Sequence, residues 1–130
     1  MLELAVRIGR HTGKVPAHQV AQTLQELQKI GRSLHIIYER QCNKPMMPEV
    51  EARVENRRNA LQEKAWDLAL YLGCAAYHQT DPRGCAIYLW PLLPEEAAMV
   101  RQDYSPRINM DTFQRAHQSD YTHGQAIPLK

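Results

Sequence analysis

The stretch YLGCAAYHQTDPRGCAIYLWP, residues 71–91, contains the change of pattern that decides the fold. Up to Leu72 the apolar residues recur with helical spacing, whereas after Gly73 they alternate as in a β-strand. The central Asp-Pro-Arg-Gly matches a type I turn, because Asp accepts a local hydrogen bond, Pro presets the first central residue and Gly tolerates positive φ. The stretch therefore predicts a helix that ends at Gly73, followed by a β-hairpin.

Two amphipathic helices precede this hairpin. Apolar spacing predicts the first from about Pro16 to Gln41 and the second from Pro48 to Leu72. The segment 43–45 separates them, since its proline disfavours helical geometry in the residue before it. The two helices are expected to pack antiparallel. Their predicted buried stripes are Val20, Leu24, Leu27, Leu34 and Tyr38 in the first helix, and Val50, Val54, Leu61, Ala65, Leu68 and Leu72 in the second.

Further elements are predicted after the hairpin. Pro91 and Pro94 end its second strand, because proline cannot donate to a ladder. A short helix is expected from Glu95 to about Gln102, and YTHGQAIPL near the C-terminus suggests a third strand that ends at Pro128. The predicted fold class is α+β, with an antiparallel helical hairpin packed on a small antiparallel β-sheet made of the hairpin and this C-terminal strand.

Composition and length set the broad class. The 130 residues, 44% hydrophobic and 23% charged, are typical of one globular domain covering 1–130, with residues 1–15 as a flexible or edge-strand arm. No apolar run approaches the length of about 20 residues that spans a bilayer, and the first residues lack the pattern of a secretory signal. We therefore expect a protein of the cytosol.

The cysteines argue against a disulfide framework and against a metal site. Cys42, Cys74 and Cys85 are an odd number without close pairing, which favours reduced thiols. A set of Cys74, His78, Cys85 and His123 lacks the spacing of known zinc sites. We therefore expect neither a metal nor another cofactor.

No recognised catalytic pattern is present. Cys42 lies near the C-terminus of a predicted helix, where the helix dipole opposes thiolate formation. An enzyme of unknown reaction could be built on Glu39, His78, Asp81 and Arg83, but their spacing matches no known site. The sequence therefore favours a non-catalytic protein.

The basic residues offer two kinds of contact. The net charge is only +2, but arginine outnumbers lysine eleven to five, and arginine favours bidentate contacts with carboxylate or phosphate. Arg7, Arg10 and Lys14 form a basic N-terminal arm that could contact nucleic acid. The charges of the second helix nearly cancel, which disfavours that alternative. Arg57 and Arg58 interrupt the apolar stripe of this helix, so its first half should be less buried, either as a solvated edge or as a place where a partner docks.

Arg83 is not explained by turn chemistry. If the hairpin runs back beside the helices, Arg83 pairs with Glu39 while Asn43 fixes the loop backbone; otherwise Arg83 is a solvated turn residue. The candidate binding residues are Arg83, Asp81, Glu39, Asn43, Arg57 and Arg58.

Three segments together resemble a known group of proteins. ERQCN from Glu39, YHQTDPRGCAIYL from Tyr77 and YTHGQAIPL from Tyr121 are similar to segments of small uncharacterised accessory proteins of bacteriophages and prophages that share a DPRG hairpin motif. The resemblance implies a protein that binds a host macromolecule, most often a protein or protein complex, and inhibition of a host defence system is one role of this kind. It supplies no catalytic residues.

Overall fold

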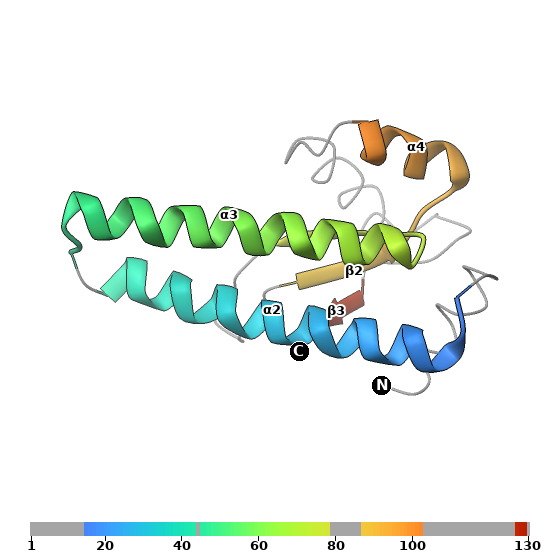
Figure 1. Cartoon of the computed structure of the whole chain (residues 1–130), viewed down its shortest axis with the longest axis horizontal. Coiled ribbons are helices and arrows are strands. Elements are labelled where there is room, and N and C mark those ends of the chain that lie inside the picture. Colours follow the sequence, from blue (N-terminus) through green and yellow to red (C-terminus); the bar gives the residue numbers. More distant parts are fainter. Residues whose placement is uncertain (1–14, 44, 79–86, 103–126, 130) are drawn as a thin grey trace.

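The computed structural model describes residues 15–43, 45–78, 87–102 and 127–129. It confirms the α+β fold predicted from the sequence (Figure 1). Its elements are α2 (Ala17–Asn43), α3 (Pro48–Tyr71), β1 (Cys74–His78), β2 (Ile87–Pro91), α4 (Pro94–Gln102) and β3 (Ile127–Leu129).

The helices α2 and α3 lie side by side and antiparallel (Figure 1), and both begin and end close to their predicted bounds. At the start of α2 the carbonyl of Pro16 accepts hydrogen bonds from the backbone of Gln19 and Val20. At the end of α3 Gly73 has a φ of 70° and donates its N–H to the carbonyl of Leu70. A positive φ is favourable only without a Cβ, so Gly73 ends the helix as predicted.

The three strands form one antiparallel sheet in the order β1-β2-β3, which confirms the predicted C-terminal strand. In β1 and β2, Cys74 lies opposite Pro91 and His78 opposite Ile87; in β2 and β3, Ile87 lies opposite Leu129. The Asp-Pro-Arg-Gly turn, Cys85 and the N-terminal arm lie outside the described residues, so the predictions for them stay predictions.

The main core lies between the helical hairpin and one face of the sheet. Its buried residues come from α2, α3 and all three strands, and Leu61, Trp66 and Leu68 pack against it while remaining half-buried. The buried members are Val20, Leu24, Leu27, Ile30, Leu34, Ala65, Ala69, Leu72, Cys74, Ala76, Ile87, Leu89 and Leu129.

The opposite face of the sheet is covered as well. A second buried cluster joins this face to the end of α3 and to α4, and Tyr77 and Tyr88 pack against it. Its buried members are Leu70, Ala75, Trp90, Leu92 and Ala97. Alternating residues of β2 therefore enter two different cores, Ile87 and Leu89 the first and Trp90 the second.

Two residues of the predicted stripes are exposed, and Val54, Leu61 and Leu68 are only half-buried. Tyr38 and Val50 fit the helical spacing but are exposed, because they lie on parts of α2 and α3 that contribute nothing to the main core. The fully buried residues of α3 are Ala65, Ala69 and Leu70, all in its second half. The prediction that its first half is less buried is thus confirmed.

Core truncation tests this arrangement. We expect Leu24→Ala to lower the free energy of unfolding by about 2–5 kcal/mol, because the Leu24 side chain is completely buried between α2 and the sheet. Leu68→Ala, at a half-buried position, should cost clearly less. Urea denaturation of both variants measures the difference, and an equal loss at the two positions would contradict the described core.

Candidate functional site

The sheet covers only one half of the helical hairpin. Within the described chain, the main core includes no residue of α2 beyond Leu34 and none of α3 before Leu61. The ends of the two helices extend past the sheet together with the link between them (Figure 1). We call this part, residues 35–43 and 45–58, the helical tip.

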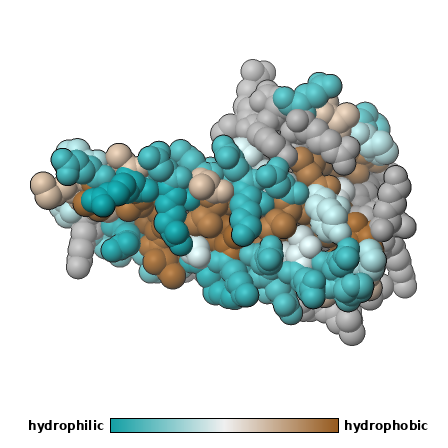
Figure 2. Space-filling view, in the orientation of Figure 1, coloured by the Kyte–Doolittle hydropathy of each residue, from teal (hydrophilic) through white to brown (hydrophobic). Residues whose placement is uncertain are grey.

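Large apolar side chains are concentrated on the helical tip. Six described residues of this kind are exposed, and four of them lie here: Ile36 at 59%, Tyr38 at 44%, Met47 at 71% and Val50 at 38%. Figure 2 shows apolar surface between polar side chains along this half of the molecule. Ile36 and Tyr38 lie on different sides of α2, because residues two apart in a helix point in nearly opposite directions, and exposed apolar side chains of this size occur at interaction surfaces.

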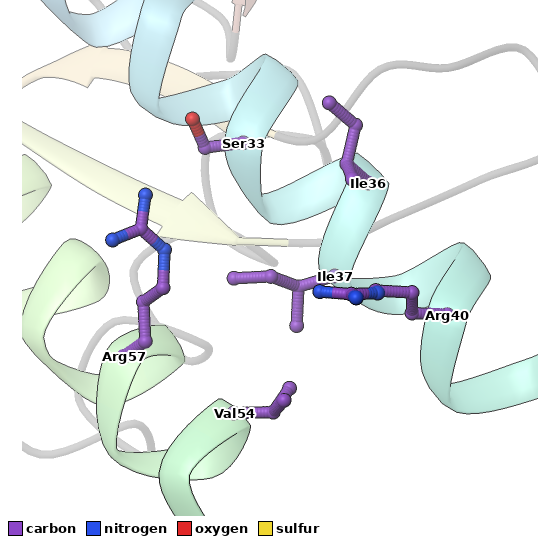
Figure 3. Close-up of a pocket in the computed structure, with 6 residues that line it drawn as sticks. All are labelled: Ser33, Ile36, Ile37, Arg40, Val54 and Arg57. Atoms are coloured by element: carbon purple, nitrogen blue, oxygen red, sulfur yellow. The ribbon is translucent and has the colours of Figure 1, made fainter. Parts of the chain in front are cut away.

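A pocket of about 240 Å³ opens between α2 and α3 at the base of the tip. Figure 3 shows Ile37 of α2 and Val54 of α3 facing each other, with the guanidinium groups of Arg40 and Arg57 on either side of them in this view. Ser33 and Ile36 complete the lining. The pocket therefore has an aliphatic floor and a basic rim.

A second hollow of about 400 Å³ lies next to the first. Its described lining residues all belong to α2 and are Ile36, Glu39, Arg40 and Asn43, so that Ile36 and Arg40 line both hollows. The structure thus brings three of the residues predicted from the sequence, Glu39, Asn43 and Arg57, to the same end of the molecule.

Two of the four acidic side chains of the tip, Glu39 and Glu55, have partners within the described chain, whereas Glu49 and Glu51 are exposed. Glu39 lies 3.1 Å from Nε2 of His35, and Glu55 forms an ion pair with Arg58. Glu55 also accepts a hydrogen bond of 3.3 Å from Gln41, which links α3 to α2. Arg58 is half-buried and paired with Glu55, and its role as a binding residue stays a prediction.

Arg40 and Arg57 differ from Arg58. Both are exposed, and within the described chain neither forms an ion pair or a hydrogen bond. Among the described residues, the positive charge on the two sides of the pocket is therefore not paired with a carboxylate. Such charge attracts an anionic group more strongly than a guanidinium that is already paired, because no internal carboxylate has to be displaced.

The remaining candidates cannot be placed in this site. Asp81 and Arg83 lie outside the described residues, as do Arg7, Arg10 and Lys14. The pairing of Arg83 with Glu39 and the contact of the basic arm with nucleic acid thus stay predictions. Glu39 itself is exposed and interacts with His35.

Five residues of the pocket were not site candidates from the sequence: Ser33, Ile36, Ile37, Arg40 and Val54, of which Val54 was predicted only as part of a buried stripe. One signal could have indicated Ile36, because two adjacent isoleucines in a helix point about 100° apart and a narrow buried stripe accommodates only one of them. Ile37 is buried and Ile36 is exposed. Arg40 has no comparable local signal.

The described residues contain no group of three or more His, Cys, Asp or Glu side chains arranged to hold a metal ion. Cys74 is buried and its Sγ donates a weak hydrogen bond to the carbonyl of Leu72 at 3.5 Å. Burial raises the pKa of the Cys74 thiol to about 12, which makes it a poor nucleophile and a poor ligand. Cys42 is exposed, and its hydrogen bond with Tyr38 raises the pKa of the Tyr38 hydroxyl.

Comparisons with protein-family models, curated proteins and solved structures found no match. None of the described helices combines the length and apolar character needed to cross a membrane. Because no known protein was matched, the resemblance to phage and prophage proteins stays a prediction. The helical tip is the feature from which a function can be proposed.

The rate of thiol alkylation tests whether Cys42 is exposed and Cys74 is buried, as the structure describes them. At pH 8 a thiol of pKa about 12 is ionised in only about one molecule in ten thousand. We expect iodoacetamide to alkylate Cys42 of the folded protein at least about tenfold faster than Cys74, and both at similar rates in urea. Peptide mass spectrometry reports each site separately. Equal labelling of Cys74 without denaturant would contradict its burial.

Proposed function

We propose that this chain is a non-catalytic protein that binds a macromolecular partner through the helical tip. The observation that carries the proposal is the gathering of exposed apolar side chains and an aliphatic pocket on the part of the helical hairpin that the sheet does not cover. Exposed aliphatic and aromatic side chains are costly in water unless another surface covers them.

The size of the pocket favours a macromolecule over a small ligand. Pockets for cofactors and drug-sized molecules enclose roughly 300–1,000 Å³, whereas the pocket between Ile37 and Val54 encloses about 240 Å³, and the described lining of the larger hollow beside it comes from α2 alone. A volume of this size suits one inserted side chain of a protein partner. The exposed residues around it, such as Ile36, then provide further contact area.

A protein suits this surface better than a nucleic acid. Single-stranded nucleic acids are held by aromatic stacking and duplexes by several phosphate contacts, whereas the floor of the pocket is aliphatic and its rim has two arginines. The resemblance to phage and prophage proteins extends the proposal to a protein of the host cell cytosol, with interference with a host defence system as the role that it suggests.

A pull-down from nuclease-treated bacterial lysate tests the proposal. We expect a specific partner to be captured by the unmodified chain and to be reduced about tenfold with Ile36→Ser, because a central apolar contact is worth more than 1 kcal/mol. Ile36 is exposed, so this substitution should leave folding intact.

Met99→Ser is the matched control, since Met99 is equally large and exposed but lies on α4, away from the tip. It should capture as much partner as the unmodified chain. Capture that survives Ile36→Ser would count against a protein partner at the helical tip, and so would capture from an untreated lysate that is absent from the nuclease-treated one.

A further inference from the structure

We infer that the helical tip recognises an acidic peptide segment, in which one large apolar side chain enters the pocket and flanking Asp or Glu carboxylates contact Arg40 and Arg57. The inference rests on the proposed function and deepens it by naming the chemistry of the partner. Its grounds are the shape of the pocket, the charges on its rim and the exclusion of two other occupants.

The pocket accommodates one large apolar side chain. An apolar cavity of about 150 Å³ can hold a benzene-sized group, so a pocket of about 240 Å³ has room for a leucine, methionine or phenylalanine side chain. Ile37 and Val54 supply aliphatic contacts from the two helices. The backbone that carries the inserted side chain must then pass over the mouth of the pocket, next to its rim.

The two arginines on the rim of the pocket favour carboxylates next to the partner side chain that enters it. Arg40 belongs to α2 and Arg57 to α3, so a peptide crossing the pocket has a guanidinium group from each helix within its reach. Guanidinium groups bind carboxylates in a bidentate manner with charge-assisted hydrogen bonds. Glu39 forms no ion pair with either guanidinium group within the described chain, and its partner there is His35.

Two other occupants fit less well. In a two-fold contact between the tips of two copies, Arg40 and Arg57 would meet the same two arginines of the second copy, which repel them. A nucleic acid would satisfy Arg40 and Arg57 with phosphates but would offer no apolar side chain to Ile37 and Val54. An acidic peptide with an apolar anchor satisfies both parts of the site.

Selection from a displayed library of random 12-residue peptides tests the inference. We expect the full chain to enrich peptides that place Leu, Ile, Met or Phe between Asp or Glu residues. Synthetic versions of these peptides should bind the Arg40→Gln/Arg57→Gln double variant at least about tenfold more weakly, and binding should weaken with added salt. Fluorescence anisotropy measures both effects.

Arg53→Gln is the matched control. Arg53 lies one turn before Arg57 on α3 and is exposed, but it lines neither hollow. Arg53→Gln removes one positive charge from α3, as the Arg57→Gln half of the double variant does, so the affinity should change by less than about twofold. A loss as large as that of the double variant would show a general charge effect and would overturn the inference.

Several other results would also overturn it: a library without enrichment, peptides that lack acidic residues, or unchanged binding to the double variant. Dimerisation that Ile36→Ser abolishes would identify a second copy as the occupant, and duplex DNA binding that requires Arg40 and Arg57 would identify phosphate as the bound group.

If non-acidic peptides are enriched and lose affinity with Ile36→Ser, the inference of acidic recognition fails while the proposed binding surface stands. If no selected peptide responds to any change in the tip, both fail.

Discussion

The connection between α3 and β1 is the constraint on which the rest of the structure depends. Only Leu72 and Gly73 separate the two elements, and the carbonyl of Gly73 accepts a hydrogen bond of 3.0 Å from the N–H of Leu92, which extends the ladder by one pair beyond Cys74 and Pro91. The sheet is therefore held against the C-terminal half of α3. A strand of five residues spans about 17 Å, whereas a helix of 24 residues spans about 36 Å. Half of the helical hairpin must extend past the sheet.

This difference in length divides the molecule into two regions with different packing. Where the sheet is present, both of its faces are buried, one by α2 and α3 and the other by α4 and the end of α3. Beyond it, the two helices have only each other as described neighbours. Ile37 is buried there, and Gln41 donates to Glu55 across the helix pair. Two helices alone cannot enclose all their apolar side chains, and the surplus forms the surface of the helical tip.

The positions of the helices and strands were predicted from the sequence better than the burial of the residues in them. Helical spacing, the glycine at position 73 and the prolines that flank the strands are local signals, and they placed all the described helices and strands. Burial is not local. Tyr38 and Val50 satisfied the spacing and are exposed, because the length of the sheet decides which part of a stripe is covered. The site was predicted in part, through Glu39, Asn43 and Arg57, but Arg40 and Ile36 belong to it through the packing of the two helices.

The separation of the helical tip from the two cores has a consequence for how such a protein can change over time. Substitutions at exposed positions such as Ile36, Met47 or Arg57 affect few internal contacts and typically alter stability by less than about 0.5 kcal/mol. Substitutions around Trp90 or Leu24 disturb close packing on both sides of the sheet. Selection for a new binding specificity and selection for a stable fold therefore act on different residues. A lineage that must follow a changing partner can vary the tip at little cost to folding.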